Sequence, residues 1–309
     1  MMKKLIFGLD IGGTKTAVIL ATPEGEFLDR VQFATKEAGG PYEVLEKACA
    51  LMEEMLVARD LTPADIAAAG ISCGGPLDDR TGVIMSPPNL PGWDEIPVTE
   101  LLTKRFGFPA YLQNDANACA VAEWKYGAGR GTRNMAFLTF GTGLGAGLIL
   151  DGRLYSGTNG NAGEVGHLRL APDGPVGFGK AGSFEGFCSG GGIAQLASKI
   201  LGKEGITAKD AAILAREGDE KAMEVFRVCG KRLGEGLSIL IDVLNPECIV
   251  IGSIYQRCED LLRPWAMEVI AREALAQAAG VCRVVPAQLG DQIGDYAAIA
   301  IAAAKLDAN

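Results

Sequence analysis

The apolar residues in the first third of the chain follow two different periods. Residues 5–11, 15–21 and 27–33 are short apolar runs in which β-branched side chains recur, separated by glycine and acidic residues. This pattern predicts three strands joined by tight turns. Residues 42–60 place apolar side chains three and four positions apart, which is typical of an amphipathic helix. Next we expect a buried strand, a strand with a proline-rich loop, a short helix, and a strand that runs into a helix (66–75, 81–93, 99–107 and 109–127).

The second half of the chain repeats the beginning of the first. Residues 134–155 again read as strand, glycine turn, strand, turn and strand. The hairpin that begins at Ala146 resembles the one that begins at Ala17, and the two lie too far apart for a short-period repeat. The elements expected afterwards are helices at 191–201, 207–219, 221–245, 261–279 and 295–307 and strands at 247–253 and 281–288. We therefore expect two related lobes.

Strands that alternate with helices predict an α/β fold with mixed sheets. Each expected lobe carries a glycine hairpin, and ligand sites are common at the interface between two domains. The expectation is a two-lobe α/β protein with a ligand cleft between its lobes.

Charge and composition argue against nucleic-acid and membrane partners. The chain has 309 residues and a formal net charge of −9, and its basic residues are scattered. A nucleic-acid partner is disfavoured, because phosphate backbones are bound by clustered basic residues. The apolar run after the first two lysines is too short for a signal peptide. The most apolar stretch, 135–150, is broken by four glycines and is too short to cross a bilayer. We expect a cytoplasmic protein without a membrane partner.

The eight cysteines are spread along the chain without any CxxC pair. Cysteines that bind a metal ion or form a redox pair usually lie closer together in the sequence. Most of the cysteines stand in apolar surroundings, where a cysteine behaves as a small core residue. We therefore expect them to pack in the core.

Two glycine turns are candidate phosphate sites. One runs from Asp10 to Lys15 and the other from Gly141 to Gly145, and neither has the GxxxxGK[ST] pattern of a P-loop. Glycines let backbone N–H groups approach phosphate oxygens closely. The carboxylate of Asp10 can bind Mg²⁺ directly or through water. Either turn alone is compatible with an ordinary tight hairpin, but two in corresponding places favour phosphate binding.

The segment QNDANA, residues 113–118, lies where a strand is expected to run into a helix. Asn and Asp are favoured as helix N-caps, so a purely structural role explains them. A carboxylate at the mouth of a cleft can also act as a general base on a hydroxyl group. The spacing alone leaves both interpretations open.

The segments DIGGTK, QNDANA, GTGLGAG and NAGEVGH, in this order, resemble the ROK family of sugar kinases, within the superfamily that includes actin and Hsp70. The resemblance extends over essentially the whole chain and is supported by GGPLD, NLPGW, EGFCSGGGI, IVIGS and GDYAAIA. It implies the actin-like ATPase fold, related to ribonuclease H. The small N-terminal lobe is expected at residues 1–113 and 295–309, and the large lobe at 114–294.

The resemblance also implies roles for individual residues. It implies an ATP-dependent kinase that acts on a free hexose, usually at the 6-hydroxyl, with Asp115 as the general base and ATP and Mg²⁺ as cofactors. The positions that correspond to sugar contacts are Gly75, Asn89, Asn114, Asp115, Glu164, His167 and Glu185. The positions that correspond to ATP and phosphate contacts are Asp10, Gly12, Gly13, Thr14, Lys15, Gly141, Thr142, Gly143 and Gly252. Ser253 follows Gly252 where the family more often has a second glycine. Homodimers are usual in the family.

One departure from the family concerns His167, the single histidine of the chain. Many family members follow this histidine with three cysteines that bind a structural zinc ion together with it. The corresponding positions here are Val176, Phe178 and Ser183. One histidine without a thiolate cannot form a closed four-ligand zinc site, so we predict no zinc. We expect Val176 and Phe178 to fill the vacated space by apolar packing. His167 is then a sugar contact or, alternatively, a hydrogen-bonded core residue.

Three other functions are compatible with parts of the pattern. An N-acetylhexosamine kinase would share every motif listed above. A sugar-responsive transcription regulator needs a DNA-binding segment before the first motif, for which Asp10 leaves no room. A catalytically silent sugar binder is conceivable because the zinc loop is changed, but Asp115 and both glycine turns are present.

Overall fold

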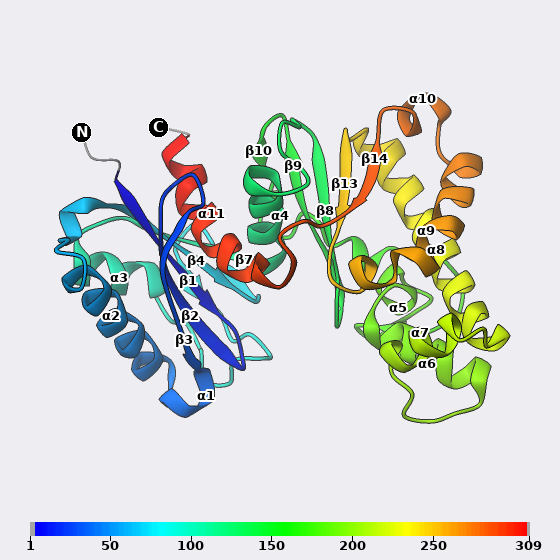
Figure 1. The fold of residues 1–309 in the computed structure, drawn as a ribbon, viewed down its shortest axis with the longest axis horizontal. Helices are drawn as coiled ribbons and strands as arrows, with labels where there is room; N and C mark the ends of the chain where they lie inside the picture. The colour runs from blue at the N-terminus through cyan, green and yellow to red at the C-terminus, as the bar shows by residue number, and fades with distance from the viewer. Residues whose placement is uncertain (1–3, 308–309) are drawn as a thin grey trace. The chain divides into compact units, whose positions relative to one another are not determined.

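The computed structural model describes residues 4–307. It divides into two compact units (Figure 1). The first comprises residues 4–130, 157–160 and 291–307, and the second comprises residues 131–156 and 161–290. Within the described residues, no helix is both long enough and apolar enough to cross a membrane.

The first unit is built on a five-stranded sheet with the order β3-β2-β1-β4-β7. β2 is antiparallel to β1 and β3, whereas β4 is parallel to β1 and β7. The strands are β1 (Leu5–Ile11), β2 (Lys15–Ala21), β3 (Phe27–Ala34), β4 (Ile66–Cys73) and β7 (Ala110–Asn114). The helices are α1 (Thr35–Ala38), α2 (Pro41–Val57), α3 (Val98–Phe106), α4 (Asp115–Tyr126) and α11 (Ile293–Asp307), and β5 (Leu77–Asp78) and β6 (Val83–Ile84) form a separate hairpin.

Side chains of the first sheet alternate between two apolar layers. Phe7 and Leu9 of β1 face α2 and α3, whereas Ile6 faces the other side. On that other side α11 packs on the sheet (Figure 1). The approach is close, because a Cβ on Gly70 of β4 would lie 2.0 Å from the carbonyl oxygen of Ala298. Glycine at this position therefore allows α11 to lie directly on the sheet.

The second unit repeats this arrangement. Its sheet has the order β10-β9-β8-β13-β14, with β9 antiparallel to β8 and β10, and with β13 parallel to β8 and β14. The strands are β8 (Met135–Phe140), β9 (Leu144–Leu150), β10 (Arg153–Leu154), β13 (Cys248–Ile251) and β14 (Arg283–Pro286). Three antiparallel strands followed by two parallel ones occur in both sheets, so the internal repeat expected from the sequence is confirmed.

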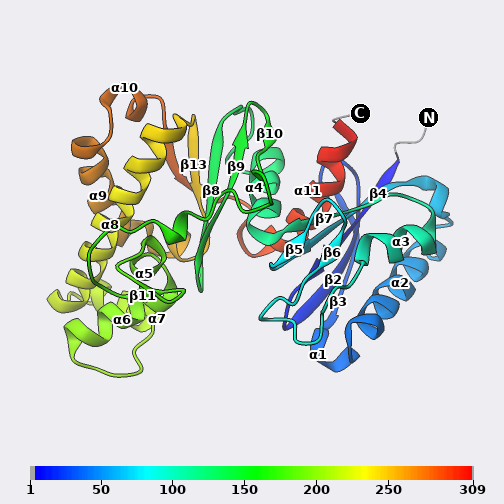
Figure 2. The same cartoon turned by 180° about the vertical axis from the view of Figure 1, so that it is seen from behind.

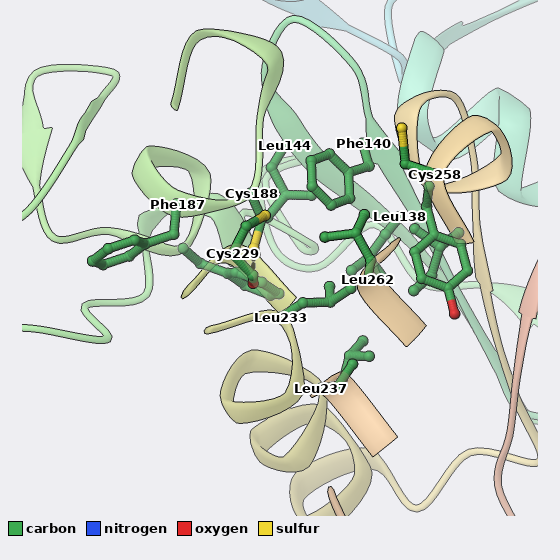
Figure 3. Close-up of a cluster of buried hydrophobic side chains, with 14 of the residues drawn as sticks. Leu138, Phe140, Leu144, Phe187, Cys188, Cys229, Leu233, Leu237, Cys258 and Leu262 are labelled. Atoms are coloured by element: carbon green, nitrogen blue, oxygen red, sulfur yellow. Dashed lines mark hydrogen bonds between the residues drawn. The ribbon is translucent and has the colours of Figure 1, made fainter. Parts of the chain in front are cut away.

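Helices form the rest of the second unit. They are α5 (Phe184–Phe187), α6 (Gly190–Leu201), α7 (Ala208–Arg216), α8 (Glu220–Leu244), α9 (Ile254–Glu273) and α10 (Ala276–Ala279). A short hairpin, β11 (Val176–Gly177) and β12 (Lys180–Ala181), lies beside α5 and α6 (Figure 2). The core between sheet and helices combines leucines and phenylalanines with cysteines, as Figure 3 shows for Leu138, Phe140, Cys188, Cys229 and Leu262. All eight cysteines are free and six are buried, as expected for packing residues.

The boundary between the units differs from the expected one at residue 113. The helix that follows, α4, packs on α11 and belongs to the first unit, which extends to Arg130. A short return segment, 157–160, also belongs to the first unit. The division between strand β7 and helix α4 therefore does not mark a domain boundary, because the apolar face of α4 is covered by the C-terminal helix.

Candidate active site

Three parallel strands of the first sheet end side by side, and candidate residues lie at these ends. Asp10 pairs with Ser72, and Ser72 pairs with Gln113. One position further, Cys73 pairs with Asn114, after which α4 begins at Asp115. The register therefore brings Asp10 and the Asn114–Asp115 pair to the same edge of the sheet.

Asn114 and Asp115 take different positions at the start of α4. Asn114 is the N-cap of α4, and its side-chain oxygen accepts a hydrogen bond of 3.0 Å from the backbone N–H of Ala116. Oδ1 of Asp115 also accepts from this N–H, at 2.8 Å. Asp115 is exposed as the first residue of the helix. Because Asn114 supplies the cap, capping does not require Asp115, and its carboxylate is accessible.

A buried polar network supports this junction, and its members were missed by the sequence analysis. Oε1 of Gln113 accepts hydrogen bonds from the backbone N–H of Asn114 at 2.8 Å and from Nδ2 of Asn117 at 3.1 Å. Nε2 of Gln113 donates to Oδ2 of Asp79 at 3.1 Å. Gln113 and Asn117 are almost fully buried, so these hydrogen bonds fix the backbone that carries Asp115. The sequence feature that could have revealed this network is the pair Gln113 and Asn117, two amide residues four positions apart where a strand runs into a helix.

The other expected sugar contacts of the first unit lie beside this junction. A Cβ on Gly75 would lie 3.3 Å from Nδ2 of Asn114. The neighbouring Gly74 is equally close to the side chain of Asn89. Gly13 of the first glycine turn approaches the backbone of Asn89 so closely that a Cβ would lie 2.2 Å from its carbonyl oxygen. The structure thus gathers Gly75, Asn89 and Asn114 with the turn that carries Gly12, Gly13, Thr14 and Lys15.

The carboxylate of Asp10 is electrostatically unusual. It is half-buried, and it lies next to the start of α11, since a Cβ on Gly294 would lie 2.6 Å from its Oδ2. The pKa of Asp10 is raised to about 6, first by burial and then by the negative charges of Asp295 and Asp115. Lys15 and Arg30 offset part of the rise. Arg30 is already paired with Asp295, with Nε 2.6 Å from Oδ2.

Asp10 suits a magnesium ion that is also bound by phosphate. Within residues 4–307, no group of three or more His, Cys, Asp or Glu side chains is placed to bind a metal ion. Mg²⁺ commonly takes only one or two carboxylates, with phosphate oxygens and waters as its other ligands. A cation near Asp10 would relieve the repulsion and desolvation that raise its pKa. The single carboxylate therefore fits this mode of binding.

The second glycine turn joins β8 to β9 and is surrounded by two other chain segments. The backbone N–H of Gly190, at the start of α6, donates to the carbonyl oxygen of Gly141 at 2.8 Å. Gly252 donates to Leu138 at the end of β8, at 2.9 Å. A Cβ on Gly141 would touch Oγ of Ser253 at 3.5 Å. The structure therefore brings Gly141, Thr142 and Gly143 together with Gly252.

A cavity of about 920 Å³ opens next to this turn, and no pattern in the sequence predicted it. It lies between α6, the loop before α7 and the start of α9. Its lining includes Gly190 and Ile254, which also pack against one another. The remaining lining residues are Ala194, Gln195, Ser198, Lys199, Glu204, Gly205, Ile206, Thr207, Ala208 and Lys209. Its size is that of a small-molecule site.

Three expected sugar contacts lie together in the second unit. Oε2 of Glu185 accepts a hydrogen bond of 2.9 Å from the backbone N–H of Leu144, which orients the carboxylate toward the second glycine turn. Gly166 packs on Glu185, because a Cβ there would lie 3.2 Å from the Cβ of Glu185. Glu164 precedes the 3-10 turn Val165–His167 and His167 ends it, and both are exposed. The interpretation of His167 as a core residue is therefore wrong.

The expected apolar packing of Val176 and Phe178 is also wrong. Their side chains are 48% and 82% exposed. They belong to the hairpin β11–β12, whose turn contains Phe178 with a φ of 43°. The Phe178 ring makes an edge contact with the ring of His167, with centroids 5.3 Å apart. The hairpin lies at the surface and is fixed by hydrogen bonds, so its apolar side chains are not drawn into the core.

The candidate residues thus form one group in each unit. The first unit contains Asp10, Gly12, Gly13, Thr14, Lys15, Gly75, Asn89, Asn114 and Asp115, and the second contains Gly141, Thr142, Gly143, Glu164, His167, Glu185 and Gly252. Each group combines a glycine turn with side chains able to hydrogen-bond hydroxyl groups.

Comparison with known proteins gives a consistent assignment. The model of the ROK family matches residues 6–305. A glucokinase of Halalkalibacterium halodurans is 30% identical over 309 residues, which cover 95% of this chain and 93% of that protein. Among solved structures, a ROK hexokinase from Thermus thermophilus superposes with a TM-score of 0.86 at 29% identity, covering 98% of this chain and 99% of that one. A ROK family glucokinase from Streptomyces griseus, in complex with glucose and AMPPNP, gives a TM-score of 0.71 at 29% identity and covers 98% of both chains.

Replacing Asp10 by Asn should stabilise the protein near neutral pH but not in acid. The unfolded carboxyl titrates near 3.8 and the folded one near 6. Between these values the folded state binds a proton that the unfolded state does not, so this group lowers stability as the pH rises through the window. We expect Asp10→Asn to raise the unfolding free energy by about 1–3 kcal/mol at pH ~7.5 and by almost nothing at pH ~4, without Mg²⁺ or nucleotide.

Urea unfolding at the two pH values measures this difference, with the exposed Asp173 replaced by Asn as a control. An equal effect of Asp10→Asn at both pH values would show that the folded carboxyl does not titrate as described.

The purified protein should contain less than about 0.1 zinc ion per chain, because a structural site needs four ligands that this loop does not supply. Elemental analysis of tag-free protein measures the zinc content, and thermal unfolding with and without a chelator measures its importance. Stoichiometric zinc, or a chelator-induced loss of stability, would contradict the prediction.

Proposed function

This chain belongs to the ROK family, and from that premise we propose that it transfers the γ-phosphoryl group of ATP to the 6-hydroxyl of a free hexose. The named glucokinases and the glucokinase complex with glucose and AMPPNP support an ATP-dependent sugar kinase. The observation that carries the proposal is the exposed carboxylate of Asp115 at the start of α4, on a backbone fixed by Gln113.

Asp115 would act as the general base. A sugar hydroxyl is almost entirely protonated at neutral pH, so a carboxylate that accepts its proton during attack assists the reaction. The hydroxyl oxygen forms a bond to the γ-phosphorus, and the bond from that phosphorus to the β–γ bridging oxygen breaks. ADP leaves with the bridging oxygen, and the hydroxyl proton passes to Asp115. Most of the remaining catalysis in such transfers is positioning and neutralisation of charge.

Each unit contains side chains that suit sugar hydroxyl groups. Asn89 and Asn114 offer amide donors and acceptors beside the base. Glu164, His167 and Glu185 offer two carboxylates and an imidazole, and each carboxylate can accept hydrogen bonds from two hydroxyl groups. The hydrogen bond from Leu144 to Glu185 supports this role, because it leaves the carboxylate oriented before the sugar arrives.

Each unit also contains a candidate contact for ATP: the first glycine turn in the first unit, and the second glycine turn with the 920 Å³ cavity in the second. The backbone N–H groups of the turns suit phosphate oxygens, and the cavity beside Gly190 suits the adenosine. Mg²⁺ neutralises phosphate charge when it is bound, and Asp10 is the residue that would bind it. Lys15 would place a positive charge beside the same phosphates. As is usual in the family, we expect the protein to act as a cytoplasmic homodimer.

Replacing Asp115 by Ala or Asn should lower kcat by about a hundredfold or more while sugar binding stays measurable, because the proton acceptor is lost and the other sugar contacts remain. ADP release is measured with MgATP and glucose, mannose, fructose, allose, N-acetylglucosamine, N-acetylmannosamine or no sugar, and calorimetry gives the sugar Kd.

The control variant is Asp60→Asn, at an exposed aspartate of the same unit. A near-normal kcat in the Asp115 variants would refute the assignment of the base. No sugar-dependent ADP release by folded wild-type protein would refute the kinase proposal itself.

A further inference from the structure

The hairpin β11–β12 is too small to be stable by itself. Each strand contributes two residues, and even longer isolated hairpins are marginally stable in water. Its turn places Phe178 at a φ of 43°, which is unfavourable for a bulky residue. The conformation of the hairpin must therefore be imposed by contacts with the rest of the second unit.

Gln195 of α6 provides the most specific of these contacts. Its Oε1 accepts a hydrogen bond from the backbone N–H of Val176, and its Nε2 donates to the carbonyl oxygen of the same residue, both at 2.9 Å. The amide thus pairs with the outer edge of β11 as a neighbouring strand would. Further hydrogen bonds join Arg169 to Ala181 at 2.8 Å and Gly182 to Pro175 at 3.0 Å.

The hairpin in turn touches His167 at two points. The ring of Phe178 contacts the imidazole edge to face, with centroids 5.3 Å apart and planes at 78°. Nζ of Lys180 donates a hydrogen bond to the backbone carbonyl oxygen of His167. One contact constrains the ring and the other constrains the backbone, so the position of His167 follows the position of the hairpin.

The base of the hairpin is equally close to Glu185. A Cβ on Gly177 would lie 2.5 Å from the backbone nitrogen of Gly186 and 2.9 Å from the Cβ of Glu185. The hairpin therefore bridges from Gln195 across Glu185 to His167. If the hydrogen bonds of Gln195 to β11 were lost, His167 at the other end of the hairpin would move more than Glu185. Glu185 is also held by its hydrogen bond from the backbone N–H of Leu144.

We propose that Gln195 is a positioning residue for His167 and acts through the hairpin Val176–Ala181. The side-chain amide fixes the edge of β11, and the hairpin then presents Phe178 and Lys180 to the histidine. The kinetic consequence rests on the proposed function, in which His167 contacts the sugar. The structural consequence does not rest on it.

Nuclear magnetic resonance of the histidine tests the structural part directly. His167 is the only histidine in the chain, so tag-free protein gives one set of imidazole signals. In the wild type these signals should be displaced by the ring current of Phe178, and Phe178→Leu gives the position without that ring. We expect Gln195→Met, which keeps the length but loses both hydrogen bonds, to move the signals at least halfway toward the Phe178→Leu position. Gln195→Glu, which loses only the donor, should move them less.

The matched control is Gln277→Met, the same change at an exposed glutamine of α10, which should leave the signals in place. Thermal unfolding verifies that each variant is folded. If Gln195→Met leaves the signals at the wild-type position while Phe178→Leu moves them, the proposal is wrong. It is equally wrong if Phe178→Leu moves nothing, because the contact with His167 would then be absent in solution.

Kinetics test the functional part. Gln195→Met should raise the sugar KM by about three- to tenfold and leave kcat and the nucleotide KM within about twofold, as expected when uniform substrate binding is weakened through hydrogen bonds of ordinary strength. Because Gln195 also lines the nucleotide cavity, a rise in the nucleotide KM alone would assign it to that cavity and refute the positioning role. If wild-type protein turns over no sugar, the proposed function fails, and the histidine signals still decide the role of Gln195.

Discussion

The position of the candidate base, Asp115, depends on the buried amide of Gln113. Its oxygen accepts hydrogen bonds from the backbone at the end of β7 and from the side chain of Asn117 in α4. The junction between strand and helix is thereby fixed at the residue that precedes the candidate base. Asn114 caps the helix and Asp115 follows it, so the carboxylate is presented by a rigid element rather than by a loop. Such support is what a general base requires, because small displacements cost large factors in rate.

In the second unit, backbone hydrogen bonds between neighbouring segments fix the position of the second glycine turn. The second glycine turn, the start of α6 and the end of β13 meet through backbone hydrogen bonds between Gly190 and Gly141 and between Gly252 and Leu138. The adjoining cavity exists because α6 and α9 both begin at this point. The proposed phosphate and nucleoside contacts of this unit therefore depend on one packing arrangement.

The sequence predicted the fold and most of the candidate site, and its failures have physical causes. The two similar sheets could be predicted because short apolar runs and the glycines of the turns between them are visible within a few consecutive residues. The grouping of Asp10 with Asp115 depends on the register of paired strands. The cavity depends on how α6, the loop before α7 and the start of α9 come together. Neither can be recognised from a short stretch of sequence. The boundary at residue 113 differed from the structure because the partner of α4 is the distant helix α11. Val176 and Phe178 were expected inside because they are apolar, but hydrogen bonds to Gln195 and from Lys180 fix their hairpin at the surface.

The most direct test of the central claim compares the best substrate of the sugar panel with its 6-deoxy analogue. We expect sugar-dependent ADP release with the substrate, none above background with the analogue, and competitive inhibition by the analogue, because the sugar contacts persist without the reacting hydroxyl. ADP release at a similar rate with the analogue would contradict transfer to the 6-hydroxyl.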